Sequence, residues 1–289
     1  MTCQDKHFYY INNTSPGFLP TGDIDQAAIA KGGRIPPQTV RTVGEALNEK
    51  GISWAYYGGA YNAAVALTKN PNSNDPTVQA GQTYCDICNF ESYVTAIMGD
   101  PAQRAAHIKD AVDFFDAVDH DELPSVSFLK PDSFIDGHPA SSKPDLFEAM
   151  VENVLDHLQA KPELFAETAL IITMDEGGGY YDSGFIQPLD FFGDGTRIPL
   201  IVVSPFTTGG HVSHAYADHV SILKFIERNW GLKPLTDRSR DNLHNPTADR
   251  DNPYVPNNMP AISDLFDIFH MDSDDLHGDN GKDDGKPRI

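Results

Sequence analysis

Apolar residues follow one another almost without interruption in several short segments of the chain. Runs of roughly four to eight such residues, without polar alternation, are typical of strands buried on both faces of a sheet. The pattern predicts strands at 52–59, 125–130, 168–174 and 198–205. The first of these ends in glycines, and the third ends in two adjacent carboxylates followed by three glycines.

Between these runs, apolar residues recur at the spacing of one face of an amphipathic helix. Thr42 and Glu45 form a capping-box pattern, so a helix is predicted to begin there and to end at Gly51. A second helix is predicted from Asp100 and Pro101 onward. Its apolar positions are Ile108, Val112, Phe115 and Val118. Two further stripes predict helices, one formed by Phe147, Met150, Val151, Val154, Leu155 and Leu158, and one by Val220, Leu223, Ile226 and Trp230, closed by Gly231.

Strands without alternation of apolar and polar residues, separated by amphipathic helices, predict the α/β class, with a mostly parallel sheet covered on both faces. In such sheets, functional residues gather at the carboxyl ends of the strands. We expect one domain over 1–268, with the Asn-, Gly- and Pro-rich residues 60–99 forming an inserted loop or cap. The acidic residues 269–289 are expected to be a disordered tail.

Composition excludes some classes of partner. The formal net charge of the 289 residues is −21, which argues against a nucleic-acid partner because phosphate backbones are held by an excess of Lys and Arg. The acidity also has a simple interpretation as a contribution to solubility. An anionic substrate would need local positive charge, such as a metal ion, against this overall field. No apolar run reaches the roughly 18–20 residues of a membrane-spanning helix.

The cysteines and the first residues leave the compartment open. Cys85 and Cys88 form a CxxC pattern without a second CxxC or a nearby His pair, which is a poor zinc signal. A disulfide, as in a secreted enzyme, and two reduced thiols are equally good interpretations. The opening residues MTCQDKHFYY contain neither the basic region nor the apolar region of a secretory signal peptide.

The strongest candidate for chemistry is Asp175 with Glu176, directly after the predicted strand 168–174. Adjacent carboxylates repel one another unless a cation lies between them, and their oxygens suit a hard divalent metal. The three glycines that follow would let the backbone approach a metal or a substrate closely. The alternative is a solvated turn whose charges point outward.

A second cluster follows the strand 125–130. Asp132, Asp136 and His138 lie within seven residues, a spacing that suits a metal or a general acid and base. The alternative is an ordinary Asp-Gly turn. A third cluster follows the strand 198–205.

This third cluster contains His211, His214, Asp218 and His219. A histidine here could bind a metal or protonate a leaving group. Asp218 could equally be the N-cap of the helix that follows. Arg197 could steer an anion, or it could pair with Asp190 or Asp194.

Together the three clusters indicate metal-assisted hydrolysis of a phosphate ester. The chain contains no nucleophile elbow, no phosphate-binding GxxxxGK loop and no GxGxxG after a strand. Five aromatic residues could line a pocket for the alcohol of the ester or could belong to the core. They are Trp54, Tyr56, Tyr57, Tyr180 and Tyr181. For Trp54 the core is the better interpretation.

The segments TMDEGGGYYD, GTRIPLIVVSPF and GGHVSHAYADHVSILKFIERNWGL, in this order, resemble the phosphoesterase family of acid phosphatases and phospholipase C-type enzymes. That family belongs to the alkaline-phosphatase-like superfamily. The resemblance implies a three-layer αβα sandwich, a phosphate ester or phospholipid headgroup as substrate, and a secreted or cell-envelope location. It implies that Asp175 and Glu176 bind a divalent metal. We expect catalytic roles for His138, His214, Asp218 and His219, and substrate contacts from Asp132, Asp136 and Arg197.

The resemblance is to the C-terminal portion of such enzymes. Family members begin with a Glu-Asn metal-binding pair in a motif like ENRSFDHYFG, followed downstream by a nucleophilic Ser or Thr, and neither segment is found in this chain. The missing parts could come from an upstream segment or a companion chain. The alternative hypothesis is an inactive, truncated or remnant domain that binds a metal, an anion or a partner without catalysis.

Overall fold

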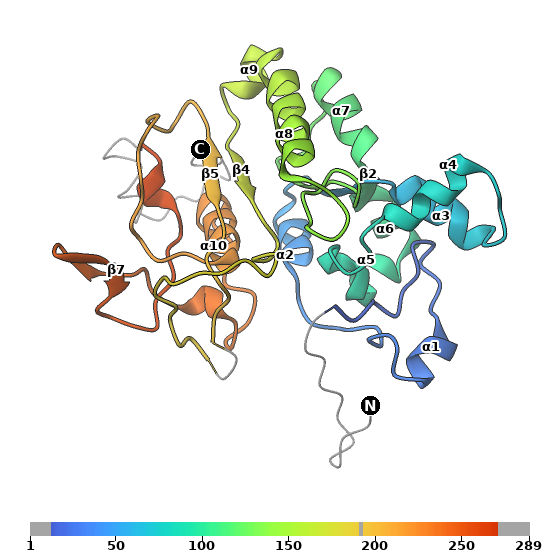
Figure 1. Cartoon of the computed structure of the whole chain (residues 1–289), viewed down its shortest axis with the longest axis horizontal. Coiled ribbons are helices and arrows are strands. Elements are labelled where there is room, and N and C mark those ends of the chain that lie inside the picture. Colours follow the sequence, from blue (N-terminus) through green and yellow to red (C-terminus); the bar gives the residue numbers. More distant parts are fainter. Residues whose placement is uncertain (1–12, 191–192, 271–289) are drawn as a thin grey trace. The chain divides into compact units, whose positions relative to one another are not determined.

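The computed structural model describes residues 13–190 and 193–270 (Figure 1). The chain divides after Lys161 into two compact units, residues 1–161 and 162–289, called unit 1 and unit 2 below. The tail expected at 271–289 lies outside the described residues. In the described part of the chain, no helix combines the length and the apolar character needed to cross a bilayer.

A three-stranded parallel sheet forms the centre of unit 1. β1 (Trp54–Gly58) lies between β2 (Ile108–Asp110) and β3 (Val126–Lys130). All five residues of β1 are buried, as its unalternated apolar sequence predicts. In the register of the sheet, Tyr56 lies beside Ile108 on one side and Phe128 on the other. The predicted strands 52–59 and 125–130 and their parallel direction are confirmed.

Eight helices of unit 1 surround this sheet or follow it in the described residues. They are α1 (Gln26–Ala30), α2 (Val43–Lys50), α3 (Tyr61–Lys69), α4 (Pro76–Gln79), α5 (Thr95–Met98), α6 (Pro101–His107), α7 (Ala111–Asp119) and α8 (Pro144–Gln159). α2 confirms its prediction: the Glu45 carboxylate accepts from the Thr42 N–H at 3.1 Å, and Gly51 closes the helix with φ 72°. Residues 60–99, expected as a loop or cap, contain α3 to α5.

The helix predicted from Asp100 through Val118 is wrong as a single element. α6 ends at His107, β2 follows, and α7 begins after Asp110, whose side chain accepts from the Val112 N–H. Ile108 pairs with β1 and is 4% exposed, whereas Val112, expected on the buried face, is 64% exposed. Pairing with the sheet has therefore overridden the local helical spacing.

The core of unit 1 also decides the role of three candidate aromatic residues. Trp54, Tyr56 and Tyr57 are 2–3% exposed and belong to this core, which agrees with the core interpretation. The Trp54 ring stacks on His107, with centroids 4.1 Å apart. Of the predicted buried stripe of α8, Val154 and Leu158 are fully buried.

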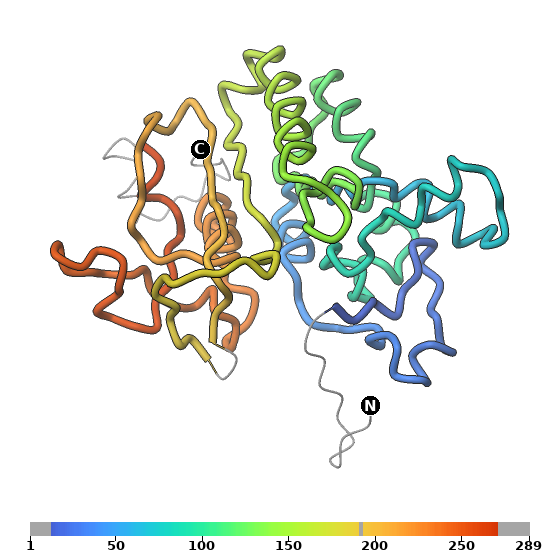
Figure 2. The backbone as a smooth tube through the Cα atoms, viewed as in Figure 1, coloured from blue at the N-terminus to red at the C-terminus, as the bar shows by residue number. Residues whose placement is uncertain are grey.

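Unit 2 contains a two-stranded sheet of β4 (Leu170–Thr173) and β5 (Leu200–Val203). Both strands were predicted, but their parallel direction was not correct: they run antiparallel, with Leu170 beside Val203 and Thr173 beside Leu200. A parallel pair needs a crossover, usually a helix, and the described residues between these strands contain none (Figure 2). The strands are half-buried, and Ile201 is 54% exposed.

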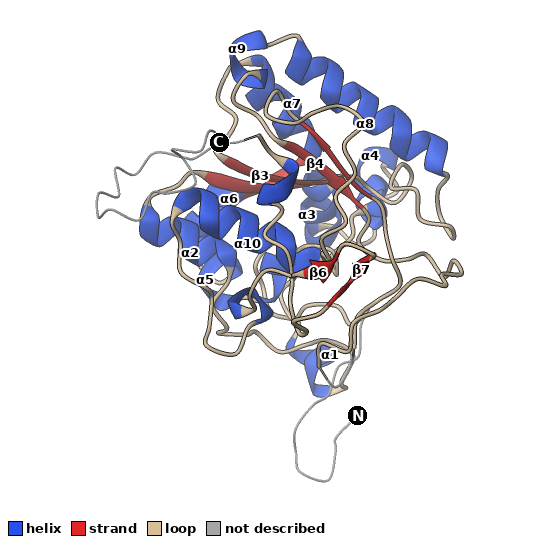
Figure 3. Ribbon diagram, turned by 90° about the vertical axis from the view of Figure 1, so that its left-hand side faces the viewer, coloured by secondary structure: helices blue, strands red, loops and turns tan. Residues whose placement is uncertain are grey.

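The remaining elements of unit 2 are α9 (Pro162–Phe165), α10 (His219–Trp230), β6 (Ala248–Asp249) and β7 (Asn252–Pro256), visible in Figure 3. α10 follows its prediction and ends at Gly231, with φ 61°. Its buried face packs on the C-terminal segment, where Phe225 stacks on Phe269 at 5.0 Å. Phe269 opens the range expected to be a tail, and it is 6% exposed. The mixed helix and strand content and the parallel sheet of unit 1 are compatible with the α/β class.

Candidate functional site

A cavity of about 960 Å³ lies in unit 2, at the carboxyl end of β4. Its wall combines the loop after β4, the segment before β5, the segment before α10, and β7. Six of the nine predicted site residues line it: Asp175, Glu176, Arg197, His214, Asp218 and His219. The structure therefore joins two of the three predicted clusters and Arg197 within one unit.

Asp175 and Glu176 occupy the turn that directly follows β4. Both residues are exposed at the cavity rather than packed in the core. The Glu176 Oε2 atom accepts from the Gly178 N–H at 2.6 Å, and Gly178 has φ 62°, a left-handed conformation that favours glycine. A side chain at Gly177 would overlap Thr196, so glycine lets the segment before β5 approach the carboxylate turn.

His219 connects the two clusters. The distance from its Nε2 atom to the Met174 carbonyl oxygen is 2.9 Å, so the ring in the tautomer with a proton on Nε2 donates to the residue before Asp175. This bond ties the first residue of α10 to the end of β4. His219 was predicted to be catalytic, and the contact that the structure shows for it is one that positions the carboxylate turn.

Asp218 is the N-cap of α10, as the alternative interpretation proposed. Its Oδ1 atom accepts from the Val220 N–H at 2.8 Å, and Ser221 completes a capping box. Its Oδ2 atom lies 3.4 Å from Arg240 Nη1. Burial raises the pKa of the Asp218 carboxyl, and the nearby Arg240 charge acts in the opposite direction.

Arg197 pairs with Asp182, a partner that was not considered from the sequence. Its Nε atom lies 3.0 Å from Asp182 Oδ1, its Nη2 atom 2.7 Å, and its backbone N–H donates to Oδ2 at 2.8 Å. These bonds hold the pKa of the Asp182 carboxyl well below its ordinary value. The guanidinium is thus fixed in orientation while the side chain stays 66% exposed. Asp194 instead accepts from the Tyr216 hydroxyl at 2.9 Å.

His214 contacts an aromatic residue that the sequence did not indicate. Its ring meets Tyr254 of β7 in a T-shaped contact, with centroids 4.7 Å apart and planes at 84°. Tyr216 and Phe185, also T-shaped at 6.1 Å, line the same cavity. Tyr180 and Tyr181, the two remaining aromatic candidates for a pocket, are exposed and are not among the lining residues.

The cluster after β3 lies in unit 1 and makes the bonds of local turns. Asp132 Oδ1 accepts from the Phe134 N–H at 2.8 Å, and Asp136 Oδ1 accepts from the His138 N–H at 2.9 Å. The Asp136 carboxylate also pairs with Lys130 Nζ at 3.3 Å. These contacts agree with the turn interpretation, and a shared site with the carboxylates of unit 2 stays a prediction.

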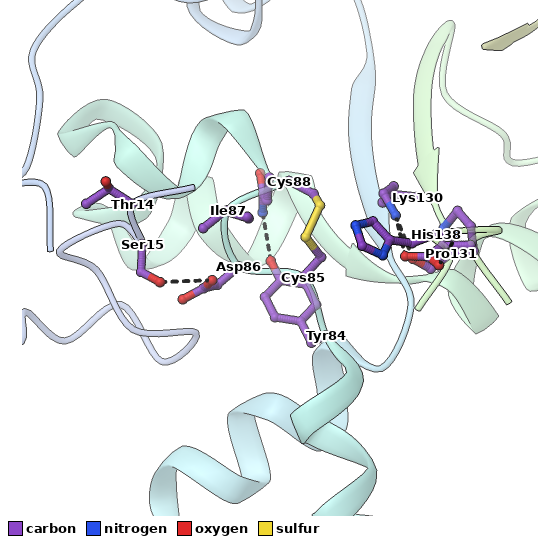
Figure 4. Close-up of a disulfide and its surroundings, with 12 residues drawn as sticks. Thr14, Ser15, Tyr84, Cys85, Asp86, Ile87, Cys88, Lys130, Pro131 and His138 are labelled. Carbon is purple, nitrogen blue, oxygen red and sulfur yellow. Dashed lines mark hydrogen bonds and ion pairs between the residues drawn. A yellow bond between two sulfur atoms is a disulfide. The ribbon is translucent and has the colours of Figure 1, made fainter. Parts of the chain in front are cut away.

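A disulfide joins Cys85 and Cys88, the first of the two alternatives for the CxxC pattern (Figure 4). Asp86, between them, accepts from the Ser15 hydroxyl at 3.3 Å and pairs with Arg34 at 3.4 Å. Figure 4 shows the His138 ring beside this disulfide. Through Asp86, the disulfide loop is therefore tied to the N-terminal segment of unit 1.

The donor set tests how well the chain fits a divalent metal. Asp175 and Glu176 supply two hard oxygen ligands at an accessible turn, which suits such an ion. In residues 13–190 and 193–270, no group of three or more His, Cys, Asp or Glu side chains is arranged to hold a metal. The chain therefore fits a two-carboxylate portion of a metal shell, and the other ligands would be water, substrate or further protein groups.

Comparison with known proteins places these residues in a family. The model of the phosphoesterase family matches residues 6–233, which include both carboxylates, Arg197 and α10. The chain is 30% identical over 229 residues to a non-hemolytic phospholipase C of Burkholderia pseudomallei (strain K96243), covering 64% of the chain and 31% of that protein. It is 28% identical over 268 residues to phospholipase C A of Mycobacterium tuberculosis (strain ATCC 25618 / H37Rv), covering 80% and 48%.

A third relative carries a different name. A probable acid phosphatase of Kluyveromyces lactis is 26% identical over 202 residues, covering 69% of the chain and 44% of that protein. The chain thus spans less than half the length of each of these relatives. Since the family model matches most of its residues, the chain belongs to the phosphoesterase family.

Proposed function

We propose that this chain carries part of the active site of a metal-dependent hydrolase that cleaves phosphoric ester bonds. The observation that carries the proposal is the shared cavity of the Asp175–Glu176 pair, Arg197 and His214 in unit 2. Membership of the phosphoesterase family and relatives named phospholipase C and acid phosphatase support it.

Asp175 and Glu176 would hold the divalent cation. When bound, such a cation supplies positive charge that stabilises the negative charge developing on the phosphoryl oxygens. The two carboxylates would keep this ion at the end of β4. The hydrogen bond from His219 to Met174 would keep the carboxylate turn in place.

Arg197 would orient the phosphate group. Asp182 engages its Nε and Nη2 atoms, so the guanidinium plane is set before a ligand arrives. The Nη1 atom takes no part in this pair and can donate to a phosphoryl oxygen. The Asp182 carboxylate partly neutralises the positive charge of Arg197. Arg197 would therefore orient the phosphate group more than it attracts it.

His214 would transfer a proton to the oxygen of the departing alcohol. It lines the cavity on the segment between β5 and α10, and the contact with Tyr254 restricts its ring. The catalytic role of His138 and the substrate contacts of Asp132 and Asp136 stay predictions. The nucleophile would come from a segment outside this chain, as the greater length of the relatives suggests.

The substrate would be a small phosphate ester or a phospholipid headgroup, in line with the names of the relatives. We also infer a secreted or cell-envelope protein, with the disulfide of unit 1 as support because structural disulfides persist in oxidising compartments.

The test removes the metal-binding charge without changing side-chain shape. In the double variant Asp175→Asn with Glu176→Gln, Mn²⁺ binding measured by calorimetry should be lost. The matched control is Asp121→Asn with Glu122→Gln, an exposed Asp-Glu pair of unit 1 outside the cavity. It should bind Mn²⁺ like the wild type.

Hydrolysis of p-nitrophenyl phosphate is measured in parallel with Mg²⁺, Ca²⁺, Mn²⁺ and Zn²⁺, with and without a chelator. It is measured for this chain and for a form extended upstream by the segment that would supply the nucleophile. Turnover by the extended form that the chelator and the site variant both abolish would support the hydrolase. Mn²⁺ binding without turnover by the extended form under any of the four cations would contradict the hydrolase and favour a binding domain. Equal Mn²⁺ affinity in the site variant and the control would remove Asp175 and Glu176 from the metal site.

A further inference from the structure

Part of the cavity wall comes from residues that lie beyond the family match. The match ends at residue 233, yet Tyr254, Leu265 and Ile268 line the cavity. Of these three residues Tyr254 is the most exposed, at 59%, so a ligand in the cavity can contact it. The chain after α10 is therefore part of the site and not an appendage to it.

Tyr254 lies on a ribbon, β6–β7, that hydrogen bonds hold to the neighbouring segments. β6 and β7 form an antiparallel ribbon, and the Asn258 Oδ1 atom accepts from the Thr247 N–H at 2.8 Å at its base. Asn258 Nδ2 donates to the Asn245 carbonyl oxygen at 2.9 Å, and Asn245 Nδ2 donates to Asp264 at 2.8 Å. These bonds connect the ribbon to the segment that packs on α10. The ring is thus presented to the cavity by a fixed element.

The second support for Tyr254 is its contact with His214. Their T-shaped contact at 4.7 Å orients both rings at the cavity. Val212, 67% exposed, adds a further apolar side chain to the lining near His214 in sequence. Large apolar groups left this exposed at a cavity indicate a ligand surface.

The two sides of a phosphate ester need different environments. Its phosphoryl group is anionic and suits Arg197 and a cation at Asp175 and Glu176. Its alcohol portion leaves with the proton that His214 would donate, so it must lie next to His214. The group that lies next to His214 in the structure is the Tyr254 ring.

We propose that Tyr254 is a specificity-determining residue that binds a flat, aryl alcohol portion of the phosphate ester against its ring. This inference rests on the proposed function, because it assigns the alcohol side of the same site. Aromatic stacking on tyrosine favours a planar ring over a small alkyl group. Phenyl phosphate should therefore bind more tightly than methyl phosphate.

The kinetic test compares these two esters in the form extended upstream. Tyr254→Ala should lower kcat/KM for phenyl phosphate about tenfold more than for methyl phosphate, mainly through KM, because loss of the contact with His214 affects both esters alike. Tyr254→Phe keeps the ring and should behave like the wild type. Tyr181→Ala, which removes a 92% exposed tyrosine outside the lining, is the matched control. Equal losses for both esters in Tyr254→Ala would overturn the proposal.

A binding test separates this inference from the proposed function. Saturation-transfer NMR with phenol, the free alcohol product, needs neither metal nor turnover. Transfer to phenol should occur in the wild type and Tyr181→Ala and be lost in Tyr254→Ala. Transfer that depends on Tyr254, without hydrolysis of either ester by the extended form, would retain the aryl subsite and refute the hydrolase. No transfer in the wild type, or equal transfer in Tyr254→Ala, would refute the aryl subsite.

Discussion

Glu91 is a fully buried carboxyl group whose titration should control the stability of unit 1. Its residue is 0% exposed, and its Oε2 atom accepts from the Thr42 hydroxyl at 3.1 Å, at the start of α2. Burial raises the pKa of Glu91 from 4.5 to about 7, and the Thr42 hydroxyl acts in the opposite direction. The substitution Glu91→Gln keeps the shape and removes the charge.

The raised pKa sets the sign of the effect. The folded chain holds the Glu91 proton at pH values where the unfolded chain has lost it, so the folded state is favoured less as pH rises from 4.5 to about 7. At about 1.4 kcal/mol for each pKa unit, the ionised group costs at most roughly 3 kcal/mol above that window. Between pH 5.5 and pH 8 the wild type should lose roughly 2 kcal/mol through this group.

The assay is urea denaturation at pH 5.5 and pH 8, both above the sequence pI of about 4.6. Trp54 is buried in unit 1, so its fluorescence reports this unit once the second tryptophan is replaced in a Trp230→Phe background. At pH 8, Glu91→Gln should be more stable than the wild type, and the difference should shrink at pH 5.5. Glu148→Gln, an exposed control on α8, should follow the wild type.

A Glu91→Gln variant that lost stability between the two pH values by as much as the wild type would refute this reasoning. The pH dependence would then arise from other groups. A variant that was less stable than the wild type at both pH values by the same amount would show that packing, and not ionisation, governs the position.

Two further predictions concern the site and the disulfide. His219→Ala removes the hydrogen bond to the Met174 carbonyl. Mn²⁺ binding at the carboxylate turn, measured by calorimetry, should weaken by roughly ten- to hundredfold. Unchanged affinity would show that His219 does not position this turn. Replacing Cys85 and Cys88 by Ser opens a very short loop. The free energy of unfolding of unit 1, measured by urea denaturation, should fall by about 2 kcal/mol because the unfolded chain gains entropy. An unchanged midpoint would contradict a stabilising role for the disulfide.

Elements with local signals were predictable from the sequence. The capping box of Thr42 and Glu45 and the left-handed Gly51 place α2 at the predicted residues, because caps satisfy backbone groups within one turn of the helix. Asp218 and Gly231 bound α10 in the same way. β1, β3, β4 and β5 were equally visible, since each is a short apolar run, whereas β2, β6 and β7 were not predicted as strands.

Pairing between distant segments was not predictable from local spacing. Ile108 has helical spacing to Val112, yet it pairs with Tyr56 and divides the predicted helix into α6 and α7. Leu170 and Val203 form strands as predicted, but their antiparallel direction depends on how the connecting segment returns. A run of apolar residues does not distinguish parallel pairing from antiparallel pairing.

The candidate site shows the same division. The adjacent carboxylates Asp175 and Glu176 at the end of a strand were identified from the sequence alone. Their connection to His219 through Met174 was not, because a side chain reaching a backbone carbonyl leaves no pattern in the sequence. The pairing of Arg197 with Asp182 could not be predicted from the order of charged residues along the chain.

The sequence by itself determined the positions of caps, turns and apolar runs, since these depend on interactions within a few residues of the chain. It also indicated the kind of chemistry to test, because the oxygens of two neighbouring acids after a strand suit a divalent cation. Only the tertiary structure decided which side chains share a cavity. Tyr254 and His214 are neighbours because the chain after α10 folds back, and no local interaction encodes that return.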